Sequence, residues 1–396
     1  MEDRIYDYWV ATLQDGYFGD IAALTEAFGG AKSLYEIIGR GGGGQIPEVM
    51  LTKRRMEYIR SHWKKEEEIK REYYSMFHNG ISYVNHADPD FPDRLRHIPS
   101  PPYGLFVKGS LPDPSLKSVA IVGARECSEY GRVCSEYFGD RLARQGVQII
   151  SGMAWGIDGI SQMAAVQAGG KSFGILGCGV DVIYPGKNAR LYEMLCENGS
   201  GIISEYAPGT PAISRGFPPR NRIISGMCDV LLVVEAKAKS GTLITVKMAI
   251  EQGKSVMAVP GRITDDLSHG CLALIRDGAV PAVGIDSVLE ELNQSRESYV
   301  QMELDLITSS VPKQKCNIDK AKTNLYMGKY KENIETDENE WLILTEMSLD
   351  PMSADNIADR TGLDISDALV SLSKLEIKGL VKEIAVGEYV RKTQIS

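Results

Sequence analysis

The segment Ser118-Val-Ala-Ile-Val-Gly123 is a short apolar run that ends in glycine, and the chain repeats this pattern. It recurs in Val147-Gln-Ile-Ile-Ser-Gly152, in Ser172-Phe-Gly-Ile-Leu-Gly177 and near residues 201–205, 229–235, 255–261 and 279–283, with helical segments in between. Apolar strands that alternate with helices predict an α/β fold with a parallel sheet covered on both faces. Ligands of such sheets bind beyond the carboxyl ends of the strands. The glycines of this chain gather at that predicted edge: Gly123, Gly152, Gly156, Gly177, Gly179 and Gly261.

Three further regions flank the predicted sheet domain, which spans residues 79–293 and opens with two short strands at 81–84 and 105–109. Residues 1–78 have helical apolar spacing, and Lys53–Arg71 reads as one highly charged helix with a solvated face. Residues 294–335 are polar without periodicity, which is typical of a linker. Residues 336–396 show the helix, turn, helix and two short strands of a winged helix. Its second helix carries few basic residues, so DNA contact and protein docking both stay open.

The net charge and the amino-acid composition exclude several classes of function. The net charge of −9 argues against a protein that coats duplex DNA, but between residues 215 and 262 eight Lys/Arg face three acidic residues. This local excess of five positive charges indicates a focused basic site. Seven scattered cysteines without a Cys-x-x-Cys pair and five scattered histidines predict neither disulfides nor a metal site. No signal sequence and no apolar run of about 20 residues is seen, so we expect a cytoplasmic protein without a membrane anchor.

The segment Phe217-Pro-Pro-Arg-Asn-Arg-Ile-Ile-Ser-Gly226 carries the strongest chemical signal. Prolines suit the entrance of a helix because they fix φ. Arg220 and Arg222 keep their charge and match phosphate oxygens in a bidentate way, and Phe217 beside them suits a stacked base. The alternative is a surface helix whose arginines pair with acidic neighbours.

Other strand ends carry possible anion contacts. Arg125 follows the first main strand and is expected to point into the pocket, although local pairing is the alternative. Ser151–Asp158 ends the second strand and opens a helix whose free amides form an anion site, with Asp158 as a structural cap. Ser240-Gly241-Thr242 precedes another helix and is expected to cradle a phosphate. Neither the dinucleotide fingerprint nor a P-loop is present, so no cofactor is expected.

These motifs, in this order, resemble the DNA-processing protein A (DprA/Smf) family. The resemblance rests on Gly123-Ala-Arg, Ser151-Gly-Met-Ala-Trp-Gly-Ile-Asp, Gly179-Val-Asp-Val-Ile-Tyr-Pro, Ile203-Ser-Glu-Tyr-Ala-Pro-Gly, the 217–226 segment and Ser240-Gly-Thr-Leu-Ile-Thr. It covers nearly the whole chain and is strongest over residues 81–293. It implies an extended Rossmann-like domain between a helical, SAM-like N-terminal domain and a C-terminal winged helix.

The resemblance also implies a function without catalysis. The protein would bind and protect single-stranded DNA, load the RecA recombinase for homologous recombination and natural transformation in competent cells, and act as a homodimer. The segment Leu267–Ile275 is the candidate for the dimer interface. Carried over by position, the DNA-binding residues would be Arg125, Gly152, Gly156, Lys187, Arg215, Phe217, Arg220, Asn221, Arg222, Ser240, Gly241 and Thr242.

Three positions depart from the pattern of the family. Gln162 stands where the family usually has histidine, Leu272 where it often has asparagine, and Ala124 replaces the commoner serine. We expect the first two to change local hydrogen bonds away from the phosphate contacts. The third removes one hydroxyl, which we expect to weaken one contact by ~1 kcal/mol.

Two other functions compete with DNA binding. An enzyme that hydrolyses nucleotides or phosphoribosyl compounds would need Glu235 or Asp158 as a general acid or base, and no paired carboxylates or activated nucleophile accompany them. A sensor would bind a small nucleotide in the same pocket and signal through the winged helix.

Overall fold

The chain folds as two compact units, residues 1–310 and residues 311–396. The computed structural model describes residues 3–14, 21–41, 53–294, 337–347, 352–378, 380–385 and 387–391. The predicted linker therefore lies almost entirely outside the described residues, and the predicted domain boundaries stay predictions. Among the helices within the described ranges, none is both long and apolar enough to cross a membrane.

The first unit is built on a nine-stranded sheet with the strand order β1-β2-β6-β5-β4-β3-β7-β8-β9. The strands are β1 (Ile81–Asn85), β2 (Gly104–Gly109), β3 (Ser118–Val122), β4 (Gln148–Ser151), β5 (Ser172–Leu176), β6 (Gly201–Ser204), β7 (Val230–Val233), β8 (Ser255–Ala258) and β9 (Val280–Pro281). The pairs β1–β2 and β2–β6 are antiparallel. Every other pair of neighbours is parallel, which confirms the predicted α/β fold.

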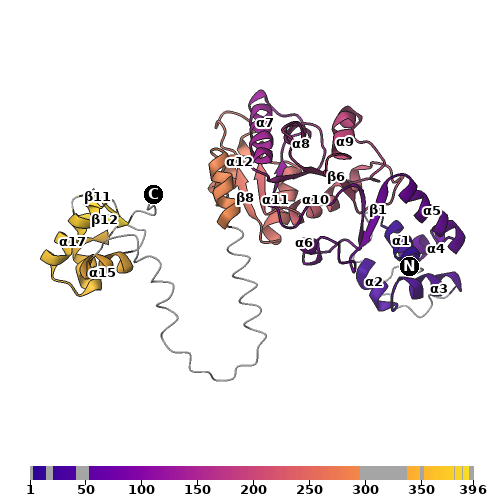
Figure 1. The fold of residues 1–396 in the computed structure, drawn as a ribbon, viewed down its shortest axis with the longest axis horizontal. Coiled ribbons are helices and arrows are strands. Elements are labelled where there is room, and N and C mark those ends of the chain that lie inside the picture. The colour runs from indigo at the N-terminus through magenta and orange to yellow at the C-terminus, as the bar shows by residue number, and fades with distance from the viewer. Residues whose placement is uncertain are drawn as a thin grey trace, which may run out of the picture. The chain divides into compact units, whose positions relative to one another are not determined.

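Strand β3 shows how both faces of the sheet are covered. Val119 and Ile121 pack in one buried cluster with α7 (Glu129–Arg144) and α8 (Ile157–Gln167). Ala120 and Val122 belong to another cluster, with α10 (Phe217–Gly226), α11 (Thr242–Glu251) and α12 (His269–Arg276). Successive side chains of a strand point to opposite faces, so a continuous apolar run requires a cover on each side. Figure 1 shows α7 and α8 on one side of the sheet and α10 and α11 on the other.

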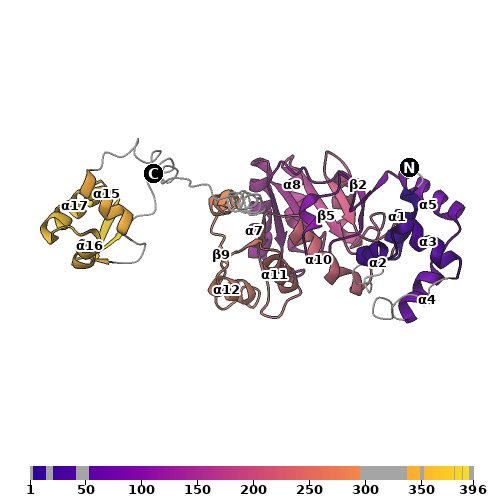
Figure 2. The same ribbon diagram turned by 90° about the horizontal axis from the view of Figure 1, so that it is seen from below.

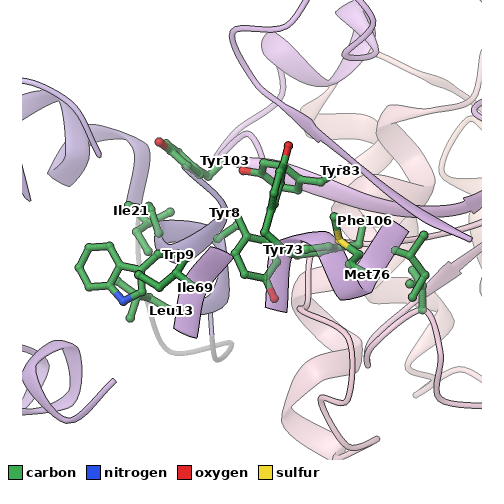
Figure 3. Packing of buried hydrophobic residues seen from close by; sticks show 14 of the residues in the cluster. Tyr8, Trp9, Leu13, Ile21, Ile69, Tyr73, Met76, Tyr83, Tyr103 and Phe106 are labelled. Carbon is green, nitrogen blue, oxygen red and sulfur yellow. The ribbon is translucent and has the colours of Figure 1, made fainter. Parts of the chain in front are cut away.

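The N-terminal helices gather at the β1 edge of the sheet (Figures 1 and 2). They are α1 (Arg4–Thr12), α2 (Ile21–Ala27), α3 (Ala31–Gly39), α4 (Lys53–Ser61) and α5 (Glu66–His78). Their shared core is aromatic (Figure 3). The ring of Tyr8 meets those of Tyr83 and Phe106 edge-on, with centroids 6.3 and 6.0 Å away. These helices and the sheet therefore share one buried cluster.

The charged segment Lys53–Arg71 was predicted as one helix, and that prediction was wrong. The structure has two helices, α4 and α5, with a break at residues 62–65. Carbonyl groups released at the break accept tertiary hydrogen bonds, from the Trp9 indole to His62 O at 3.0 Å and from the Tyr35 hydroxyl to Lys64 O at 2.9 Å. Charge interleaving does not reveal such partners, because they come from distant helices.

The second unit confirms the predicted winged helix. Helices α15 (Glu338–Glu346), α16 (Ala354–Thr361) and α17 (Ile365–Ile377) accompany strands β10 (Met352–Ser353), β11 (Val381–Ala385) and β12 (Glu388–Arg391). The strands form a sheet in the order β10-β12-β11, so the wing gains a short strand that was not predicted. Buried Ile343, Ile357, Leu372 and Val381 form its core.

The remaining short elements of the first unit lie in its loops. They are α6 (Asp93–Arg96), η1 (Gly186–Asn188), α9 (Ala189–Leu195) and η2 (Ser214–Gly216), and residues 285–294 are also helical.

Candidate nucleic-acid interface

A cavity opens where the direction of the chain through the sheet reverses. Strands β3 and β7 are neighbours, but β3 leads to β4 on one side and β7 leads to β8 on the other. Loops that diverge in this way leave a crevice beyond the carboxyl ends of the strands. The cavity there has a volume of about 430 Å³. Seven of the twelve predicted contact residues line it: Arg125, Phe217, Arg220, Asn221, Ser240, Gly241 and Thr242.

Helix α10 brings an aromatic ring close to two cations. Its first turn contains Pro218 and Pro219, which fit there because the first amides of a helix have no partner within it. The ring of Phe217 is half-buried, and the guanidinium carbons of Arg125 and Arg220 lie 5.8 and 5.9 Å from its centroid. These distances fit cation–π contacts. A half-exposed ring flanked by arginines can stack a base while the cations hold phosphates.

Arg220 is buried, with 5% of its surface exposed, and it is held by backbone carbonyls. Its guanidinium donates to Gly152 O at 2.8 Å and to Ile175 O, at the ends of β4 and β5. Burial lowers the pKa of Arg220 to about 10, while the nearby Asp158 carboxylate opposes that decrease. The side chain therefore stays charged at neutral pH in a fixed position.

The glycines beside these arginines are required by packing. A Cβ atom on Gly152 would lie 2.6 Å from the Arg220 Nη1 atom. Gly156 has a φ of +85°, and a Cβ atom there would lie 2.3 Å from Arg125 O. Both positions exclude a side chain. Gly152 and Gly156 thus position the two arginines rather than line the cavity themselves.

The start of α11 forms the opposite wall of the cavity. The Thr242 hydroxyl donates to Gly123 O at 3.1 Å, which joins the helix to the end of β3. The Thr242 amide donates to the Ser240 hydroxyl at 3.2 Å. A Cβ atom on Gly241 would meet nothing within 4 Å, so its backbone faces open space. The positive end of the helix dipole adds to the charge of the arginines.

Two of the predicted contact residues lie elsewhere. Arg222 pairs with Glu205 at 2.7 Å and donates to Ser100 O at 2.7 Å. A helix turns about 100° per residue, so positions 220 and 222 face nearly opposite directions and only Arg220 reaches the cavity. Arg215 lines a separate cavity of about 1340 Å³, between α5 and the loop after β6.

Lys187 and two unpredicted aromatic residues stand beside the cavity. The Lys187 ammonium lies 4.8 Å from the ring centroid of Trp155. The Tyr184 ring lies 5.4 Å from that of Phe217, with a 32° angle between their planes. Trp155 and Tyr184 are 47% and 43% exposed. An aromatic residue in a glycine-rich strand-end loop is the sequence signal that could have singled them out.

The two carboxylates on which an enzyme would depend have structural partners. Glu235 is buried and accepts from the amide of Ser128 at 2.9 Å and from its hydroxyl at 2.5 Å, which fixes the start of α7. Asp158 accepts from the amide of Gly152 at 3.1 Å, and burial raises its pKa. Neither arrangement provides an activated nucleophile or an accessible base.

Comparison with known protein families agrees with this architecture. The family model described as DNA recombination-mediator protein A matches residues 82–293, and that of the DprA winged helix domain matches residues 330–385. The chain belongs to the DNA recombination-mediator protein A family. Family membership confirms the resemblance drawn from the motifs.

Individual proteins of the family are also similar to this chain in sequence and in structure. The chain is 43% identical over 204 residues to DNA processing protein DprA of Streptococcus pneumoniae, covering 52% of this chain and 72% of that protein. It is 34% identical over 306 residues to protein Smf of Escherichia coli, covering 77% and 76%. The X-ray structure of DprA from S. pneumoniae superposes with a TM-score of 0.61 at 32% identity, covering 74% of this chain and 98% of that chain.

Gln162, where the resemblance led us to expect histidine, has a structural role. Its side chain is buried; it accepts from the Met153 amide at 3.1 Å and donates to the Ser172 hydroxyl at 3.1 Å. Met153 has a φ of +53°, so this bond secures a strained turn after β4. Leu272 is half-buried on α12, and neither residue lines the 430 Å³ cavity.

Proposed function

We propose that the 430 Å³ cavity binds single-stranded DNA and that the chain acts as a recombination mediator without catalysing a reaction. The observation that carries this proposal is the placement of Phe217 beside both Arg125 and Arg220 at the reversal point of the sheet. In the proposed contacts, Arg125, Arg220 and the 240–242 loop hold phosphates, and Phe217 stacks a base. Asn221 offers an amide to the same strand, and Lys187 extends the cationic edge.

A single strand suits this site better than a duplex. Stacking on Phe217 requires an exposed base face, which a duplex hides inside its stack. Only two cationic side chains, Arg125 and Arg220, are among the described residues that line the cavity, and the chain as a whole carries a net charge of −9, so the site does not form the broad basic surface that duplex coating requires. A mononucleotide fits the volume but would use few of the cations that line the edge.

The test is fluorescence anisotropy with a labelled oligo-dT of about 20 nucleotides and a matched duplex, at two salt concentrations. Wild type is expected to prefer the single strand. Arg125→Ala is expected to weaken binding at least about tenfold, and to reduce the salt slope by about 0.7, because one charged phosphate contact is lost. Arg40→Ala is the matched control, because Arg40 is an exposed arginine paired with Glu36 on α3. Tighter binding to the duplex, or equal effects of both substitutions, would contradict the proposal.

The downstream role follows from family membership. We infer that the bound strand is protected and passed to the RecA recombinase, in the cytoplasm, during homologous recombination and natural transformation, and that the working form is a homodimer. The segment Leu267–Ile275, largely on α12, is the proposed interface. Light scattering would give the oligomeric state. RecA loading would be tested by measuring filament growth on single strands coated with a single-strand-binding protein, with and without this chain. If this chain does not stimulate filament growth, its function is limited to strand binding.

A further inference from the structure

Two exposed aromatic residues beside the cavity have no part in the contacts proposed above. Trp155 lies between the end of β4 and the start of α8, and it is 47% exposed. Tyr184 lies between β5 and η1, and it is 43% exposed. Neither belongs to a buried cluster of the described residues. Nearly half of each side chain is therefore accessible at the edge of the sheet where the cavity opens, although Lys187 lies over Trp155 and Phe217 lies beside Tyr184.

The rings of Trp155 and Tyr184 lie next to the cavity that Phe217 lines. All three line one small cavity of about 60 Å³, together with Arg125 and Arg220. Tyr184 lies against Phe217 at 5.4 Å; Trp155 and Tyr184 come from two different loops, and Phe217 comes from the start of α10. The result is an aromatic rim that begins in the 430 Å³ cavity and extends away from it.

Cations accompany the rings along this rim. Arg125 lies over Phe217, and the Lys187 ammonium lies 4.8 Å from the Trp155 ring centroid. A single-stranded nucleic acid alternates flat bases with anionic phosphates, which matches this alternation of rings and cations. The groove on the other side of Trp155 has a different character. Arg125 also reaches this groove, but its other two arginines, Arg132 and Arg144, are paired with acidic side chains on α7, so a polyanion would gain little from them.

We propose that Trp155 and Tyr184 stack bases of the single strand and so extend its binding site beyond the 430 Å³ cavity. This inference rests on the proposed function, because it takes the same ligand to a further part of the same site. It predicts a footprint longer than the cavity and tolerance of base identity, since every base has a π-face. The alternative role of the two rings is to brace Lys187 and Phe217 without touching DNA.

The experiment separates stacking from bracing by removing the bases. Full-length protein is titrated with labelled oligo-dT of about 20 nucleotides, and with an oligonucleotide of equal length in which abasic residues replace the central thymidines. Wild type is expected to bind the oligo-dT more tightly. Trp155→Ala and Tyr184→Ala are each expected to lose about tenfold for oligo-dT and much less for the abasic strand. Trp155→Phe and Tyr184→Phe keep a ring and are expected to recover most of the affinity.

Each outcome has one meaning. Equal losses on both strands would show that the rings only brace their neighbours, and no loss in either alanine variant would also overturn the stacking proposal. If wild type binds neither strand, or if Arg125→Ala binds as wild type does, the proposed function itself fails. Tryptophan emission gives a second readout from the four tryptophans of the chain, because Trp155 is 47% exposed whereas Trp9 is buried and Trp63 is half-buried. Quenching by oligo-dT of equal amplitude in wild type and in Trp155→Phe would contradict a base stacked on Trp155.

Discussion

The strand-end cavity and helix α17 of the winged helix both carry cations, but the side chains of these cations have different hydrogen-bond partners. In the cavity, Arg220 donates to the backbone carbonyls Gly152 O and Ile175 O, and its guanidinium also faces the Phe217 ring. On α17, Lys374 pairs with Asp337 at 3.0 Å. Just after the helix, Lys378 pairs with Glu340 at 2.6 Å. The Asp158 carboxylate lies near Arg220 and stabilises its charge, but the Nη1 atom of Arg220 donates to carbonyls, whereas Lys374 and Lys378 donate directly to carboxylates.

The exposed surface of α17 is also less suited to an anionic ligand than the cavity is, because it is apolar and acidic. Ile365, Leu369 and Val370 are exposed on the helix that usually reads DNA in winged-helix proteins. Asp364 and Asp367 stand beside them at its first turn. This comparison favours protein docking over DNA contact for the winged helix, which is the alternative left open by the sequence.

The largest effect is expected from Arg220→Ala. The substitution leaves the buried Asp158 carboxylate without its cation, so unfolding should require about 3–5 kcal/mol less free energy, and oligo-dT binding should be lost. Arg220→Lys keeps the charge, so its stability and its affinity for oligo-dT should fall between those of wild type and Arg220→Ala. Urea denaturation followed by circular dichroism would measure the stability.

The pH dependence of Arg220→Ala has a defined sign. Burial already raises the folded-state pKa of Asp158, and loss of the cation should raise it further. A carboxyl whose folded pKa exceeds its unfolded pKa stabilises the fold at low pH and loses this advantage as the pH rises through the folded value. The deficit of the variant should therefore be smaller at about pH 5 than at about pH 8. A deficit independent of pH would show that Asp158 does not carry the effect.

A smaller effect is expected from Gly152→Ala. The new methyl group would meet the guanidinium of Arg220 at 2.6 Å and must displace it, at a cost of about 1–3 kcal/mol in stability and with weaker strand binding. Gly241→Ala is the matched control, because its Cβ would meet nothing within 4 Å and its φ of −59° suits alanine. Thermal unfolding of both variants would test the comparison, and anisotropy would measure strand binding of Gly152→Ala alone, because Gly241 belongs to the proposed phosphate loop. Equal unfolding temperatures of Gly152→Ala and Gly241→Ala would mean that packing against Gly152 does not hold Arg220.

The smallest effect is expected from Lys374→Ala on α17. Its ammonium is already paired with Asp337, so the affinity for oligo-dT should change by less than about twofold, and the unfolding temperature should hardly move. Anisotropy with the same oligonucleotide is the measurement. A loss as large as that of Arg125→Ala would place the winged helix on DNA and remove the distinction between the two regions.

Much of the fold could be predicted from the sequence because its signals are local. Apolar runs such as residues 118–122 predicted buried parallel strands, and β3 packs on both faces as such a run requires. The break between α4 and α5 could not be predicted in this way. It depends on hydrogen bonds from Trp9 and Tyr35, which reach the break only in the folded chain.

The parallel strands and the winged helix could be predicted from the sequence, because periodicity and glycine positions are properties of short segments, while the binding chemistry at the strand ends stays a prediction. Which arginine lines the cavity depends on the tertiary structure. Arg220 and Arg222 are equal in the sequence, but the turn of α10 directs one to the ends of β4 and β5 and the other to Glu205. The same holds for Trp155 and Tyr184, whose proximity to Phe217 depends on loops that the sheet brings to one edge. Distances between loops are set by strand order, and no single segment of the sequence contains that order.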